Sequence, residues 1–148
     1  MRFWQTAWQS IVFGNPAAYL DRILAAGFDG IYVDRADVAD YWLAGRPSAR
    51  REMADLMIRI AAYARRKRPD ILILMQNAEE LLENRQVVEA IDGVAKEDLF
   101  YGIAHDQSAN SRGDVQATVD LLRRLKRRGK AVLVVEYLAT GSGKAEDA

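Results

Sequence analysis

The sequence has no cysteine and only one histidine, His105. Without cysteine, disulfide bonds, thiolate catalysis and cysteine-ligated zinc sites are excluded. A serine–histidine–aspartate triad would have to use His105, and a metal site built from several histidines is impossible. These two shortages restrict the chain to chemistry that needs neither thiols nor histidine clusters.

Neither sign of charge is in excess, because 21 acidic residues balance 21 basic ones. The balance gives no general attraction to polyanions, so we expect no nucleic-acid partner. Basic clusters at 65–68 and 123–130 fall where two predicted helices end, and cations there complement the helix dipole. No apolar run reaches the ~18 residues of a membrane span, and residues 1–10 lack the pattern of a signal peptide.

Nucleotide-binding motifs are also missing. Gly143-Lys144 resembles the end of a phosphate loop, but Leu138 stands where the loop needs glycine and Ala145 where it needs serine or threonine. No dinucleotide fingerprint is present, and the spacing of Asp34 and Asp37 gives no support to a metal site. We therefore expect no cofactor and no metal.

Strand patterns alternate strictly with helix patterns along the chain. This order predicts an α/β fold with a parallel sheet and right-handed crossovers. We expect Asn15 and Asp114 to cap the first and fourth helices. By length the chain is one domain, which we place at 1–138, with a small polar tail at 139–148 expected to be disordered. The predicted strands are 30–34, 71–75, 93–95 and 131–136, and the predicted helices are 16–26, 48–66, 78–90 and 114–127.

Polar residues end all four predicted strands: Asp34, Asn77, Glu97 and Glu136. A helix cap would explain any one of them, but the same placement on four strands favours a site at the carboxyl end of a (β/α)8-type barrel. Side chains alternate along a strand, so residues two and four earlier should share the face of each end residue. The lumen should therefore also hold Gly30, Tyr32, Met75, Ala95 and Val134.

Two carboxylates facing each other across a sugar are the usual apparatus of glycoside hydrolysis, and Asp34 and Glu97 fit by position. As the acid of such a pair, Glu97 would need a raised pKa, and alternation should turn Lys96 to the opposite face. Asp37 is a third candidate, with a helix-start cap as the competing interpretation. Trp42 falls in a predicted loop, as do Trp4, Trp8 and Tyr41, and such aromatics either bind sugar or pack on a neighbouring helix.

The segment 19–42, YLDRILAAGFDGIYVDRADVADYW, resembles the core signature of glycoside hydrolase family 114, the endo-alpha-1,4-polygalactosaminidase-like barrels. Segments 73–82, 91–101 and 132–138 are also similar to that family. The resemblance implies a (β/α)8 barrel, hydrolysis of galactosamine-containing polysaccharide, and export from the cell. It implies Asp34 as nucleophile and Glu97 as acid/base. The expected substrate-binding residues are Tyr32, Asp37, Asn77, Glu136 and Trp42.

The chain departs from a complete barrel in length. A full barrel takes at least ~200 residues and eight strands, whereas four strands are predicted here. Two alternatives follow: the chain is a fragment or truncated product that is inactive alone, or it closes by self-association. Half a barrel exposes two strand edges and an apolar lumen, which a second copy related by a two-fold axis would cover by supplying the missing half. Two other functions stay open: a non-catalytic sugar-binding or assembly module on the same scaffold, and an open-sheet binding protein.

Overall fold

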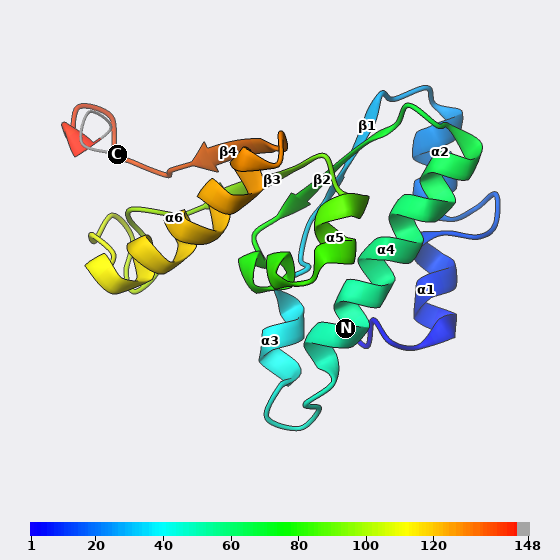
Figure 1. Cartoon of the computed structure of the whole chain (residues 1–148), viewed down its shortest axis with the longest axis horizontal. Coiled ribbons are helices and arrows are strands. Elements are labelled where there is room, and N and C mark those ends of the chain that lie inside the picture. Colours follow the sequence, from blue (N-terminus) through cyan, green and yellow to red (C-terminus); the bar gives the residue numbers. More distant parts are fainter. Residues whose placement is uncertain (145–148) are drawn as a thin grey trace.

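The computed structural model describes residues 1–144, which form a parallel sheet of four strands in the order β1-β2-β3-β4 (Figure 1). Every neighbouring pair is parallel. The predicted alternation and strand order are therefore confirmed. The strands are β1 (Gly30–Val33), β2 (Leu72–Gln76), β3 (Gly93–Glu97) and β4 (Ala131–Val135).

The helices agree with the sequence pattern except in three places. The short helices α1 and α3 were not predicted, and the predicted helix 78–90 is divided in two. Asn84 causes the division, because its backbone is extended and its side-chain oxygen accepts the Gln86 N–H at 2.9 Å, which starts a new helix. The helices are α1 (Thr6–Val12), α2 (Tyr19–Ala25), α3 (Val38–Trp42), α4 (Ala49–Lys67), the 3-10 helix η1 (Glu79–Glu83), α5 (Arg85–Ala90) and α6 (Arg112–Arg127).

The predicted caps Asn15 and Asp114 are displaced from the helix starts. Asn15 accepts the Ala17 N–H at 3.0 Å in a turn that precedes α2. In α6 the cap is Ser111, whose hydroxyl oxygen accepts the Asp114 N–H at 3.1 Å. Ser111 has the extended backbone that a cap needs, whereas Asp114 already lies inside the helix and accepts a bond from the Ser111 hydroxyl.

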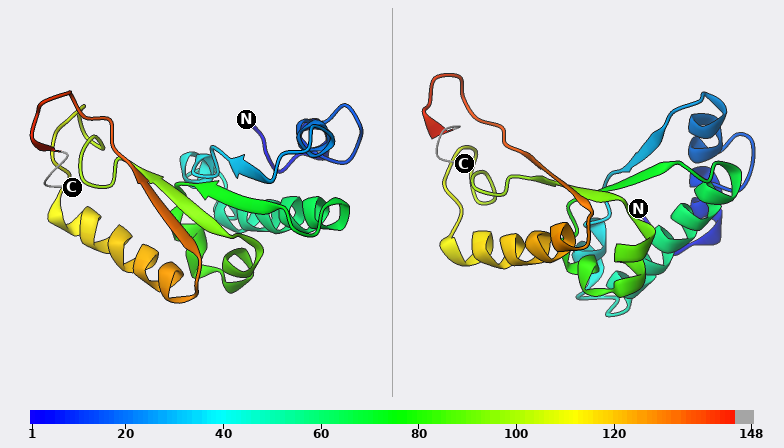
Figure 2. Two further views of the ribbon diagram at one scale, coloured as in Figure 1. Left: turned by 90° about the horizontal axis from the view of Figure 1, so that it is seen from above. Right: turned by 45° about the horizontal axis from the view of Figure 1, so that its top comes forward.

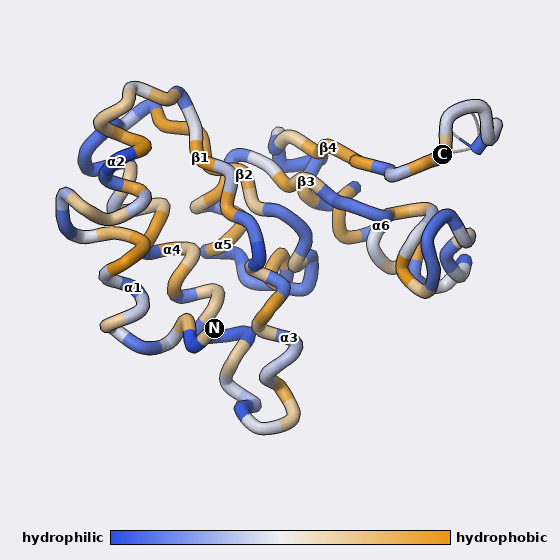
Figure 3. Tube along the Cα trace, turned by 180° about the vertical axis from the view of Figure 1, so that it is seen from behind, coloured by the Kyte–Doolittle hydropathy of each residue, from blue (hydrophilic) through white to orange (hydrophobic). Residues whose placement is uncertain are grey.

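One face of the sheet is covered and the other is open. Helices α4 and α6, with η1 and α5 between them, pack on the same face, and Figure 2 shows the opposite, concave face without a covering layer. Ile73 and Met75 are fully buried on the covered face, whereas Tyr32 and Leu133 are about half exposed on the other. Figure 3 shows apolar colouring along the strands.

The barrel is not closed. Within residues 1–144 no strand pairs with the outer edge of β1 or of β4. The fold is thus a partial barrel of TIM type, a curved sheet with helices outside. Within the same residues, every helix is too short or too polar to span a bilayer. At the predicted tail, the Ala139 N–H and the Lys144 ammonium bond to Gln107, and residues 145–148 lie outside the described part.

The register of the paired strands shows which residues face the lumen, and on two strands these differ from the predicted ones. Tyr32 pairs with Leu74, and Ala95 pairs with both Gln76 and Leu133. Partners across parallel strands share a face, so β2 and β4 are shifted by one residue from the predicted phase. Met75 and Val134 therefore face the helices, and that prediction was wrong. The open face carries Gly30, Tyr32, Leu72, Leu74, Gln76, Gly93, Ala95, Glu97, Leu133 and Val135.

Glycine is required at the start of β3 because its neighbours approach closely. A Cβ atom at Gly93 would lie 2.7 Å from the Ala131 carbonyl oxygen and 2.9 Å from the Leu74 side chain. Such contacts are shorter than real Cβ atoms tolerate. The tight pairing of β3 with β4 therefore depends on the missing side chain, whereas the Leu74 methyl group belongs to a flexible side chain that can turn away.

A buried carboxylate ties the N-terminal helices to α4. Asp21 is 6% exposed and accepts bonds from the Gly14 N–H at 3.0 Å, the Tyr63 hydroxyl at 2.6 Å and the Lys67 ammonium at 2.5 Å. Burial alone would raise the pKa of Asp21, but bonds from Lys67, Tyr63 and Gly14 outweigh it and hold that pKa below its usual value.

We predict that Asp21→Asn lowers the free energy of unfolding by about 2 kcal/mol, since an amide cannot satisfy this set of donors. The contribution of a carboxylate with a lowered pKa is present at neutral pH and is lost as pH falls through the folded-state pKa. The difference between wild type and variant, measured by urea denaturation, should therefore shrink in acid. Asp29→Asn is the control, since Asp29 forms an exposed ion pair with Arg68; equal losses in both variants would contradict the prediction.

Candidate active site

The carboxylate of Glu97 lies at the carboxyl end of β3, on the open face of the sheet, in contact with both neighbouring strands. Gln76, the last residue of β2, donates its side-chain N–H to Oε2. Tyr137, two residues beyond β4, donates its hydroxyl to Oε1 at 2.5 Å. The Asn77 amide donates to Oε2 at 3.4 Å. Glu97 is thus surrounded by donors that suit a negative charge.

These donors lower the pKa of Glu97. The bond from Tyr137 contributes most, and burial opposes it, but bonds from Gln76 and Asn77 and the charge of Lys96 act in the same direction as Tyr137. The raised pKa expected for Glu97 was therefore wrong. The sequence pattern could not show that a hydroxyl from beyond β4 reaches this carboxylate.

Asn77 reaches the site through an unusual backbone, not through strand alternation. It and Ala78 both have positive φ, 52° and 54°, and this left-handed turn follows β2 directly. The Asn77 side-chain oxygen accepts the Glu97 N–H at 2.9 Å. Lys96 extends to the other face, as predicted, and pairs there with Glu79 at 3.3 Å.

Tyr32 and Asp34 come from β1. Tyr32 is 49% exposed on the open face, and burial of its hydroxyl, then the charges of Glu97 and Asp34, raise its pKa. Tyr32 is thus near enough to both carboxylates to sense them. Asp34 is exposed and makes no side-chain hydrogen bond or ion pair with the rest of residues 1–144. Both residues line a groove of about 740 Å³ along β1, with apolar side chains of α1, α2 and α4.

The two expected sugar-binding residues beyond β1 have other partners. Asp37 is exposed and lies 3.7 Å from the Arg35 guanidinium. It precedes α3 without a side-chain cap bond. Trp42 belongs to α3 and packs edge-on against Trp4, with ring centroids 5.1 Å apart. The structure thus gives Trp42 a packing role on the helical side, and sugar binding by either residue stays a prediction.

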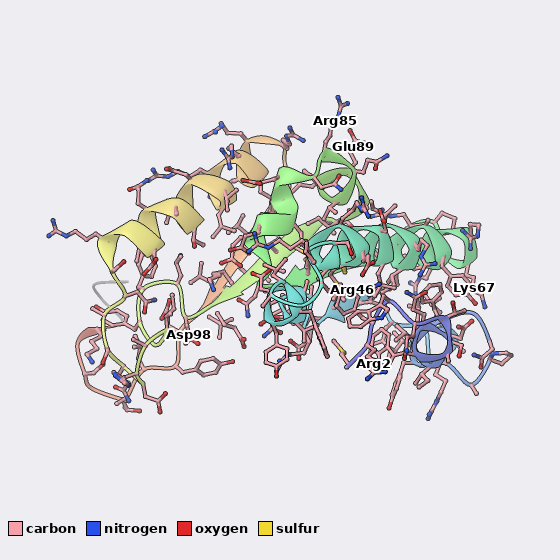
Figure 4. The ribbon with its side chains drawn as sticks, turned by 90° about the horizontal axis from the view of Figure 1, so that it is seen from below. Arg2, Arg46, Lys67, Arg85, Glu89 and Asp98 are labelled. Atoms are coloured by element: carbon pink, nitrogen blue, oxygen red, sulfur yellow. The ribbon has the colours of Figure 1, made fainter. Side chains whose placement is uncertain are left out.

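Glu136 organises the loop after β3. Its carboxylate oxygens accept the Phe100 N–H at 2.9 Å and the Tyr101 N–H at 3.3 Å. Asp98 lies in the same loop (Figure 4). Burial first, then the charges of Glu136 and Glu97, raise the pKa of Asp98. Glu136 thus fixes the loop after β3, and backbone donors occupy both of its carboxylate oxygens.

Two site residues, Gln76 and Tyr137, were not predicted from the sequence. The apolar run from Ile71 to Met75 carries no alternation, so it could not show that Gln76 ends the strand on the open face. Tyr137 lies beyond the last strand, where pattern gives no direction. A polar residue directly after an apolar run was the one available signal for Gln76.

The arrangement is suited to stabilising positive charge beside an ionised carboxylate. Glu97 presents a negative charge to the open face, and Asp34 offers a second carboxyl group at the end of β1. Residues 1–144 bring no three acidic or histidine side chains together as metal ligands. What the geometry offers is thus the carboxylate of Glu97 and the phenol of Tyr32 on one concave surface, with Asp34 directly after β1.

Comparison with known proteins identifies two relatives by sequence and one by structure. The chain is 37% identical to an uncharacterized protein of Thermotoga maritima, over 99% of this chain and 45% of that protein. It is 34% identical to an uncharacterized protein of Deinococcus radiodurans, over 91% of this chain and 42% of that protein. The glycoside hydrolase domain of PelA from Pseudomonas aeruginosa superimposes with a TM-score of 0.69 at 19% identity, over 95% of this chain and 53% of that domain.

The chain spans less than half the length of these two curated relatives. The structural likeness to the PelA domain shows the fold alone, because the identity is low, and it agrees with a partial barrel. The model of glycoside hydrolase family GH114 matches residues 1–148, the whole chain. The resemblance first suggested by residues 19–42 is confirmed, and the chain belongs to glycoside hydrolase family GH114.

Proposed function

We propose that this chain carries the two carboxylates of a glycoside hydrolase that acts on galactosamine-containing polysaccharide. The observation that supports it most is Glu97, whose ionised side chain stands at a strand end on the open face. Asp34 directly follows β1, and Tyr32 senses the charge of both carboxylates. Membership of the GH114 family favours this chemistry over the alternative of a non-catalytic sugar-binding module.

The lowered pKa of Glu97 does not suit the acid/base role that the resemblance implied. A carboxylate held by a phenol and two amides is suited to facing the oxocarbenium-like transition state as nucleophile or charged stabiliser. We expect retention, with the carboxyl groups about 5–5.5 Å apart in the working site, against about 6.5–9.5 Å for inversion. Both the roles and the separation belong to the proposal.

Substrate binding needs more of the barrel than residues 1–144 provide. Tyr32, Leu72 and Leu133 are each about half exposed on the concave face, and an apolar sheet face in water is an unfavourable arrangement for a monomer. We propose that a second copy covers it, with β4 of each copy adding to β1 of the other. A two-fold axis along the barrel would then close a ring of parallel strands.

The first prediction is catalytic. Glu97→Gln and Asp34→Asn should each reduce release of reducing ends from a galactosamine polymer by about 10²-fold or more, the usual loss on removing a catalytic carboxyl. In the wild type, the charged form of Glu97 is lost only as pH falls below the ordinary value of 4.5. The acidic limb of kcat/KM that Glu97 controls should therefore lie below that pH.

Glu89→Gln is the matched control for these variants, because Glu89 pairs with Arg85 on the solvent side of α5 (Figure 4). Circular dichroism should show an unchanged fold in all of them. Substantial activity in either site variant would mean that the wrong carboxylate has been assigned. If the wild type binds the polymer but never cleaves it, the non-catalytic alternative replaces the proposal.

The second prediction concerns association. Sedimentation equilibrium should give a mass near twice the 16.6 kDa of one chain. Leu133→Lys places a charge on the apolar face of the edge strand β4, so it should shift the mass toward that of a monomer. Glu89→Gln should leave the mass unchanged. A monomeric wild type at micromolar concentration would contradict the proposed pairing.

A further inference from the structure

Glu97 receives one side-chain donor from each side of β3, and the two donors reach different oxygens. Gln76 from β2 donates to Oε2, and Tyr137 from beyond β4 donates to Oε1. No other acidic residue of the open face receives side-chain donors from both sides within the described residues. The carboxyl group is therefore held across the sheet, between strands that are far apart in the sequence.

We propose that Tyr137 and Gln76 are positioning residues, which fix the plane of the Glu97 carboxyl group and aim it at the open face of the sheet. The inference rests on the proposed function, to which it adds the residues that orient the charged carboxylate. In this proposal neither side chain breaks a bond or transfers a proton. Their task is to hold Glu97 in one orientation before a sugar arrives.

Geometry explains why two donors are needed. The terminal torsion of glutamate is broad, so a carboxylate with one partner can still turn about its own axis. Donors on separate oxygens from opposite sides remove that freedom, and bonds to an ionised acceptor are about twice as strong as neutral ones. Gln76 ends β2 and Tyr137 follows the end of β4 by two residues, so both donors are anchored at the carboxyl edge of the sheet.

The exposure of Tyr137 supports a specific role for its hydroxyl. The residue is 63% exposed, so burial of the ring contributes little to stability. It nevertheless turns back toward Glu97, with a hydroxyl-to-carboxylate distance of 2.5 Å. The Glu97 bond, then burial, raises the pKa of Tyr137, as expected for a phenol that donates to an anion.

Removing that hydroxyl leaves every charged side chain around Glu97 in the sequence. Lys96 lowers the pKa of Glu97 by its charge, pairs with Glu79 and donates to the Asn77 side-chain oxygen at 3.4 Å. Tyr32 and Asp98 sense the charge of Glu97 from β1 and from the loop after β3, and Tyr32 also senses the charge of Asp34. A Tyr137→Phe substitution therefore isolates the contribution of one hydrogen bond.

The test is a carbon-13 NMR titration of the Glu97 side-chain carboxyl in the intact chain. In Tyr137→Phe the pKa of Glu97 should rise toward its ordinary value of 4.5, and Gln76→Ala should raise it further in the double variant. Tyr101→Phe is the control, because the Tyr101 hydroxyl makes no hydrogen bond within residues 1–144. It should leave the Glu97 titration unchanged.

A reciprocal measurement guards against a variant that fails to fold. In Glu97→Gln, the pKa of Tyr137 should fall toward the ordinary value of 10.0, followed by NMR of labelled tyrosine. The inference would be overturned if the pKa of Glu97 were the same in Tyr137→Phe as in the wild type, and the pKa of Tyr137 were the same in Glu97→Gln. The titrations need no substrate. If the chain cleaves no polysaccharide, the proposed function is wrong, but the titrations still test whether Tyr137 and Gln76 position Glu97. In an active preparation, Tyr137→Phe should lower kcat more than it changes KM.

Discussion

The parallel register between β2, β3 and β4 determines the rest of the site. Because Gln76 pairs with Ala95, and Glu97 pairs with Val135, the ends of three strands meet at one edge. A shift of one residue in either pairing would turn Glu97 or its donors to the helical face. The charged carboxylate and its bond from Gln76 therefore follow from strand pairing, whereas Asn77 and Tyr137 reach Glu97 from the segments that follow β2 and β4.

At that edge the pKa of Glu97 is lowered, whereas burial alone would raise the pKa of a carboxyl group. Glu97 is only partly buried, and three side-chain donors favour its charge over its protonated form. Asp98, next along the chain, has the opposite tendency because burial and two neighbouring carboxylates favour its proton. Two consecutive acidic residues thus have pKa values shifted in opposite directions by their different surroundings. Their position at the end of β3 does not by itself decide their charge.

The sequence predicted the layers better than the details of the site. Alternating patterns were sufficient for four parallel strands, and family resemblance pointed to Asp34 and Glu97 before any geometry was known. The phase of β2 and β4 was wrong because apolar runs such as 71–75 have no periodicity from which to choose a face. Tyr137 could not be found, since its role depends on a contact between residues 40 positions apart. The break at Asn84 was hidden within an otherwise helical pattern.

Gly93 has no functional group, yet it controls the site from the opposite end of its strand. Any side chain there would press on the Ala131 backbone and force β4 away from β3. A displacement of β4 would carry Tyr137 with it. An alanine at this position would therefore act as a remote loss-of-function change, disconnecting Glu97 from Tyr137 while leaving every polar residue of the site in the sequence.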